Sequence, residues 1–157
     1  MKKIKISLYI IIIIVLSSCG YSRLDNQLNE FKFNRIEING DKRLSYILKN
    51  NLNLLSKSES KKSYDLLINL TNSKTSKIKD TTGKTTRFNV VLNGDLKLTD
   101  NNKVVKNRSF TVNNDYDVSN NHSDTVRNEK NSIQNNIDSL SEEITKYIQL
   151  INLNKWF

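Results

Sequence analysis

Along most of this chain, hydrophobic and polar positions recur with one of two periods: two residues, typical of a strand, or three to four residues, typical of a helix. Residues 31–39 alternate well enough to predict a strand, and their apolar parity changes between Phe33 and Ile36, which indicates a bulge. Gly40 interrupts the strand, and Asp41 suits the N-cap of a helix. Apolar residues then recur at helical spacing and form one stripe: Leu44, Ile47, Leu48, Leu52 and Leu55.

Three later segments have a period of two and predict strands. The first spans 64–71, and the third spans 104–118. In the second, one parity is apolar (Phe88, Val90, Leu92, Leu96, Leu98), and the other carries Arg87, Asn89, Asn93, Asp95, Lys97 and Thr99. Polar turns at 79–84, built around Gly83, and at 100–102 separate these segments, so an antiparallel three-stranded meander is expected.

From about Ser123 to Ile151 the period returns to three and four, which predicts a long amphipathic helix with Ser123 or Asp124 as its cap. The element order is β-α-β-β-β-α. Two helices with apolar stripes need a surface to cover, and a sheet that is apolar on one face supplies it. We therefore expect an α+β two-layer sandwich, with two helices packed on one face of a mostly antiparallel four-stranded sheet and the other face polar.

The first thirty residues have a different pattern. Three lysines precede an apolar run at 6–16, which is too short to span a bilayer and fits a secretory signal peptide. Leu16-Ser17-Ser18-Cys19 has the form of a bacterial lipobox, in which the cysteine is lipidated. A buried structural cysteine is the alternative. We predict a lipoprotein signal peptide at 1–18, a lipidated tether at 19–30 and a single α+β domain at 31–157.

Composition and charge narrow the functional classes. The chain has 157 residues, a net charge of +9, one cysteine and one histidine, which excludes an internal disulfide framework, a cysteine-based zinc cluster and a multi-histidine metal site. The basic charge would suit nucleic acid, but a secreted, lipidated address argues against that partner. His122, the single histidine, falls in a polar, asparagine-rich turn. We assign no catalytic residue, metal or cofactor and expect no enzyme.

Several features of the sequence point to one family. They are Cys19-Gly20-Tyr21 after the lipobox, the element order, Gly-x-Thr-Thr-Arg at 83–87, Tyr116 and the final helix from about 122 to 151. In these features the chain resembles the family of the lipopolysaccharide (LPS)-assembly lipoprotein LptE. The chain departs from the family in lacking a polar tail and an N-terminal proline. The resemblance implies an outer-membrane lipoprotein, anchored on the periplasmic side, that plugs and helps assemble the LptD-type β-barrel and binds LPS on its way to the surface.

Candidate ligand contacts follow from this expectation. Arg and Lys side chains would meet the phosphates of LPS. Lys79, Lys84 and Arg87 lie at or beside the first hairpin tip, and Arg127 and Lys130 lie at the start of the last helix, the two regions where family contacts fall. A solvated basic loop is the alternative for each. Polar residues on the open sheet face would line a barrel lumen or simply face solvent.

Two other functions remain open from the sequence. One is a free-standing, periplasm-facing lipoprotein that binds an envelope ligand or inhibits a hydrolase. The other is an accessory subunit of a different outer-membrane barrel or secretin machine.

Overall fold

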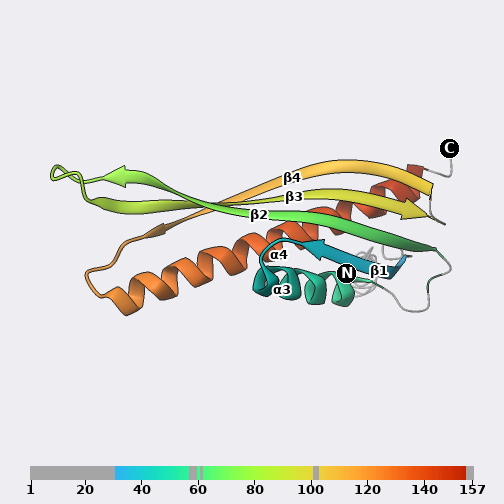
Figure 1. Cartoon of the computed structure of the whole chain (residues 1–157), viewed down its shortest axis with the longest axis horizontal. Helices are drawn as coiled ribbons and strands as arrows, with labels where there is room; N and C mark the ends of the chain where they lie inside the picture. Colours follow the sequence, from blue (N-terminus) through green and yellow to red (C-terminus); the bar gives the residue numbers. More distant parts are fainter. Residues whose placement is uncertain (1–30, 57–59, 61, 101–102, 155–157) are drawn as a thin grey trace, which may run out of the picture.

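Two helices cover one face of a four-stranded sheet (Figure 1). The structure, a computed structural model, describes residues 31–56, 60, 62–100 and 103–154. The elements are β1 (Lys32–Asn39), α3 (Lys42–Leu55), β2 (Ser63–Lys79), β3 (Thr85–Asp100), β4 (Lys103–Asp117) and α4 (His122–Asn154). β1 is parallel to β2, whereas β2, β3 and β4 form antiparallel pairs. The predicted α+β fold and its β-α-β-β-β-α order are confirmed.

The turn from β1 into α3 is built by two residues that the sequence singled out. Gly40 has φ +135°, a conformation that favours glycine, and a Cβ there would lie 2.3 Å from the Leu70 carbonyl oxygen. Asp41 Oδ1 accepts hydrogen bonds from the Arg43 and Leu44 N–H groups, both at 2.9 Å, so the predicted N-cap is confirmed. The predicted bulge is present as well, between Phe33 and Arg35.

The hydrophobic core lies between the sheet and the two helices. The even-numbered residues of β3 from Val90 to Leu98 are buried in it. Gly94 lets α4 approach closely, because a Cβ at this position would lie 3.3 Å from Leu140 Cδ2. α3 contributes Leu44, Leu48 and Leu52, which belong to the predicted stripe. The fully buried core side chains include Phe31, Leu48, Leu52, Leu66, Ile68, Leu92, Leu98, Ile137, Leu140, Ile144 and Ile148.

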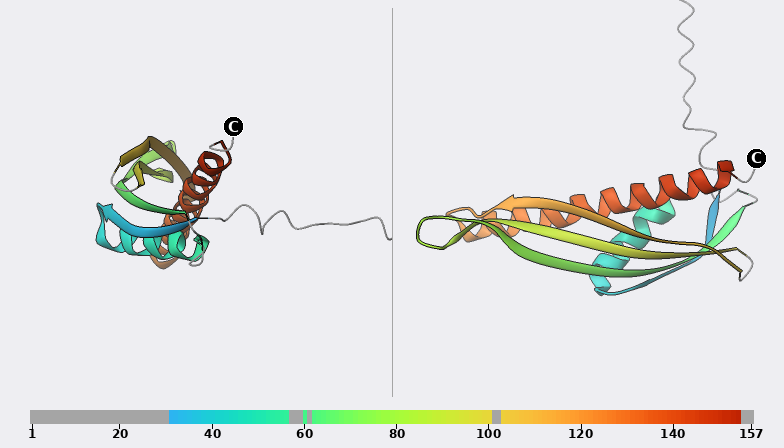
Figure 2. Two further views of the ribbon diagram at one scale, coloured as in Figure 1. Left: turned by 90° about the vertical axis from the view of Figure 1, so that its right-hand side faces the viewer. Right: turned by 90° about the horizontal axis from the view of Figure 1, so that it is seen from above.

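α4 runs along the length of the sheet (Figure 2). Its cap differs from the prediction. Asn121 Oδ1 accepts the Ser123 N–H at 3.0 Å, so Asn121 caps the helix, and Ser123 and Asp124 belong to its first turn. The helix also buries polar groups, and Asn136 Nδ2 donates to the Val90 carbonyl at 2.9 Å.

The hairpin of β2 and β3 extends beyond the core as an arm (Figures 1 and 2). The sequence predicts β2 only to Thr71, but the strand continues to Lys79, and every residue from 71 to 79 is exposed. The predicted tip is confirmed, because the Asp80 N–H donates to the Lys84 carbonyl at 2.9 Å and the Gly83 N–H donates to the Asp80 carbonyl at 3.0 Å. Neither α3 nor α4 combines the length and apolarity needed to cross a bilayer.

Candidate functional site

The five cations predicted as ligand contacts gather at one end of the molecule, which we call the distal end: residues 77–87, 115–118 and 121–130 (Figure 1). Two hydrogen bonds hold these segments together. The Val118 N–H donates to the Thr86 carbonyl at 2.9 Å, and Asn128 Nδ2 donates to the Asp117 carbonyl at 3.2 Å. The structure therefore brings Lys79, Lys84, Arg87, Arg127 and Lys130 to the same end of the fold.

Arg87 and Arg127 are already engaged by carboxylates. Arg87 contacts Asp117 through two hydrogen bonds, Nε to Oδ1 at 2.6 Å and Nη2 to Oδ2 at 3.2 Å. Asp117 raises the pKa of Arg87, chiefly through these bonds, and Arg87 lowers the pKa of Asp117. Arg127 pairs with Asp124 at 2.8 Å, one helical turn away.

The three predicted lysines differ from the two arginines. Within the part of the chain that the structure describes, Lys79, Lys84 and Lys130 form no ion pair. All three are exposed. An incoming anion would therefore meet these ammonium groups without first breaking an ion pair. The Asp80 carboxylate lies close enough to Lys84 for the lysine charge to contribute to the lowered pKa of Asp80.

A cluster that the sequence did not reveal joins the arm to α4. Lys74 Nζ donates to Glu129 Oε1 at 2.8 Å and lies 5.2 Å from the centre of the Phe88 ring, a cation–π contact. Phe88 stacks on Tyr116 with centroids 5.5 Å apart. The hydrogen bond to Glu129 raises the pKa of Lys74, and burial raises the pKa of Tyr116. The polar context of Lys74 in the sequence gives no sign that it faces the helix, because its partner is 55 residues away.

The face of the sheet opposite the helices, which we call the open face, carries rows of hydrogen-bonded polar side chains. Thr111 donates to Asn93 at 2.8 Å across β4 and β3, and Asn89 donates to Asp115 at 2.7 Å. Further pairs are Ser109 with Asp95, Asn39 with Asn69, and Lys77 with Asp115. Two half-buried apolar residues, Leu67 and Val91, interrupt this polar surface. No described helix covers it, as the period-two pattern predicts.

In the part of the chain that it describes, the structure shows no further site at the other features that the sequence analysis considered, namely metal binding and His122, and it does not describe Cys19. Among the described residues, no three His, Cys, Asp or Glu side chains are grouped so as to hold a metal ion. His122 lies exposed at the start of α4. Cys19 and the boundaries of the segments 1–18 and 19–30 fall outside the described residues, so lipidation of Cys19 stays a prediction.

The fold is one that solved bacterial lipoproteins share. Rare lipoprotein B from Shewanella oneidensis aligns with a TM-score of 0.60 over 79% of this chain and 100% of its own, at 10% identity. Lipoprotein B from Nitrosomonas europaea aligns with a TM-score of 0.61 over 83% and 92% of the two chains, at 14% identity. A minor lipoprotein from Acinetobacter baumannii aligns with a TM-score of 0.54 over 79% and 93%, at 17% identity.

These similarities establish a common fold and leave function to be argued from the chain itself. The sequence matches no protein-family model and no curated protein.

Proposed function

We propose that the protein is an outer-membrane lipoprotein, anchored through Cys19 on the periplasmic side, that plugs an LptD-like β-barrel, helps it to assemble and binds LPS during delivery to the cell surface. The observation that carries the proposal is the open face: four strands wide, polar and uncovered by either helix. The lipobox at 16–19 and the fold shared with named bacterial lipoproteins support the anchor.

The open face has the chemistry that a barrel lumen would accept. The interior of an outer-membrane barrel is polar, so a plug must present hydrogen-bonding groups to it. Asn93, Asp95 and Asn89 already have cross-strand partners, which hold their side chains in place. Such preorganised groups lose less conformational entropy on docking than free side chains would.

The distal end supports the lipid-binding part of the proposal. The phosphates of LPS are anionic, and Lys79, Lys84 and Lys130 are exposed cations that form no ion pair within the described chain. Arg87 and Arg127 would take part by exchanging a carboxylate for a phosphate. The protein would act by binding and positioning alone, without covalent chemistry.

Depletion of the protein in its native bacterium tests the proposal. We expect the LptD-like barrel to misassemble and LPS to accumulate in the periplasm, and we expect the wild-type chain to restore both. A Cys19→Ala chain should remain unlipidated, as its mass would show. Normal barrel folding and normal surface LPS after depletion would refute the proposal and favour a free-standing lipoprotein. Misassembly of another barrel or of a secretin would instead favour an accessory subunit of that machine.

A further inference from the structure

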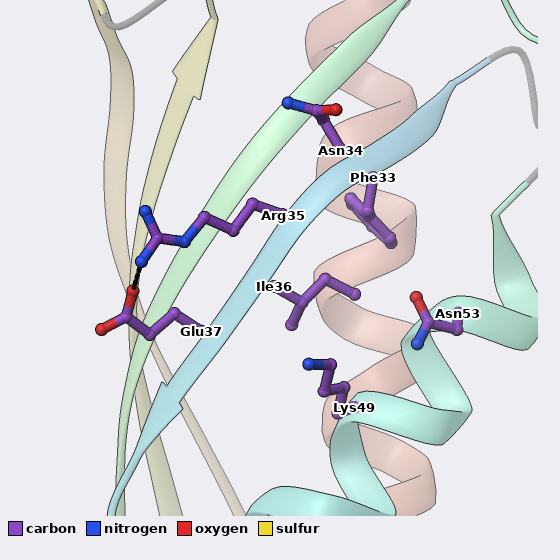
Figure 3. A pocket seen from close by; sticks show the side chains of 7 residues that line it. All are labelled: Phe33, Asn34, Arg35, Ile36, Glu37, Lys49 and Asn53. Carbon is purple, nitrogen blue, oxygen red and sulfur yellow. Dashed lines mark hydrogen bonds and ion pairs between the residues drawn. The ribbon is translucent and has the colours of Figure 1, made fainter.

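A hollow of about 410 Å³ lies between β1 and α3, at the β1 edge of the sheet and outside the distal end (Figure 3). It is lined by residues 33–37 of β1 and by Lys49 and Asn53 of α3. β1 is the first strand of the sheet, and in the described chain only β2 pairs with it. The outer edge of β1 therefore offers backbone N–H and C=O groups that no described strand satisfies.

The bulge in β1 gives the hollow two different walls. Asn34 and Arg35 both turn toward the open face, since Asn34 Nδ2 donates to Asp65 Oδ1 at 3.2 Å and Arg35 pairs with Glu37 at 2.8 Å. Phe33 and Ile36 turn toward the helices, where Phe33 is partly buried and Ile36 is 7% exposed. The hollow thus has an apolar floor, and at its outer rim Arg35 and Glu37 neutralise each other's charge.

The helix wall is cationic. Lys49 points toward β1 and is exposed, and it forms no ion pair with any described residue (Figure 3). α3 holds two further cations, Lys42 and Arg43, and no acidic residue. An occupant of this hollow would therefore gain from carrying negative charge next to Lys49.

We propose that this hollow binds an extended, acidic peptide segment, which adds to the free edge of β1 as a further strand. Its backbone would pair with residues 36–39, an apolar side chain would cover Phe33 and Ile36, and a carboxylate would contact Lys49. Strand addition beside a helix combines backbone hydrogen bonds for affinity with alternate side-chain pockets for specificity. A bilayer surface fits this site less well, because the site is concave and the groups that it leaves unsatisfied are backbone donors and acceptors. The proposal does not depend on the barrel or on LPS.

The test uses the full chain in a neutral detergent and a fluorescein-labelled ten-residue peptide of alternating valine and glutamate, with anisotropy as the readout. We expect the wild type to bind the peptide and Lys49→Glu to weaken binding by about tenfold. Lys106→Glu, an exposed position on the opposite edge strand β4, is the matched control and should change binding by less than about twofold. Amide hydrogen exchange within residues 36–39 should slow when the peptide binds.

A second peptide separates strand addition from simple charge attraction. It keeps the glutamates but replaces two central valines with proline, which removes N–H donors, and we expect it to bind about tenfold more weakly. Equal binding of both peptides, equal binding by Lys49→Glu, or no binding by the wild type would each overturn the proposal. So would binding of anionic phospholipid vesicles at Lys49 without binding of the peptide.

Discussion

Arg87 and Asp117 face one another as direct cross-strand partners on β3 and β4 and form two hydrogen bonds. The guanidinium that the sequence marks as a phosphate contact is therefore already held by a carboxylate. A phosphate must compete with Asp117 for the same planar donors. Lys79, Lys84 and Lys130, which form no ion pair in the described chain, are then the first contacts that an anionic lipid would make.

Removal of the competitor should strengthen anion binding. We expect Asp117→Asn to raise the affinity for LPS by about threefold, because Arg87 is released and one negative charge is lost. Lys84→Glu should lower the affinity, and both effects should shrink as salt increases. Lys106→Glu on β4, outside the distal end, is the control for net charge. If LPS binding is unchanged in both Asp117→Asn and Lys84→Glu, the distal end is not a lipid-binding site.

Stability at acidic pH should depend on two carboxylates at the end of β4, Asp115 and Asp117. Lys77 and Asn89 lower the pKa of Asp115, and Arg87 lowers the pKa of Asp117. A lowered folded-state pKa contributes stability that is present above the unfolded value, about 3.9, and that is lost as the pH falls through the folded value. The double variant Asp115→Asn, Asp117→Asn should therefore lose less stability than wild type as the pH falls below about 4. Urea unfolding across this range measures the difference, and parallel curves would contradict the expectation.

Two glycines with positive φ provide a matched pair. Gly40→Ala should cost about 2–4 kcal/mol, because the residue adopts φ +135° and the new Cβ would overlap the Leu70 carbonyl oxygen. Gly83→Ala should cost about 1 kcal/mol, since it has φ +85° but open space around it. The free energies of unfolding in urea compare the two. Similar costs would show that the contact with Leu70 contributes little.

The close approach of Leu140 to Gly94 predicts that a larger side chain at position 94 will not fit beneath α4. Gly94→Val should destabilise the fold by about 1–3 kcal/mol, because its side chain would enter the space of Leu140 and lies near Ile68. Lys97→Val, three residues along β3 and exposed on the open face, should stay within about 0.5 kcal/mol of wild type. Thermal unfolding of the pair checks this. A Gly94→Val protein as stable as the Lys97→Val protein would mean that α4 does not pack against β3 at this point.

Local patterns predicted most of the fold because each element has one buried and one exposed face. The alternation around Leu92 and Leu96 identified the buried side of β3, and Asp41 identified the start of α3. The arm beyond Thr71 was missed because its side chains are exposed on both faces, so no apolar alternation marks it. Its length is set by pairing with β3, which a local pattern does not record.

The sequence identified the basic residues of the distal end, but it did not reveal most of their ion-pair partners. Asp124 and Arg127 are three residues apart on a helix, a spacing that predicts their ion pair. The pairs of Arg87 with Asp117 and of Lys74 with Glu129 depend on strand register and on where α4 crosses the arm. Asn121 was missed as the cap of α4 because several polar residues in that turn suit the role equally.

Site-specific photocrosslinking tests the proposed plug function most directly. Crosslinkers at Lys97, on the open face, and at Lys84, at the hairpin tip, would be activated in intact outer membranes before the tagged chain is recovered. The account predicts crosslinks from both positions to one large β-barrel protein. A clean monomer, with crosslinks only to lipid or to soluble proteins, would contradict it and would leave a free-standing envelope lipoprotein.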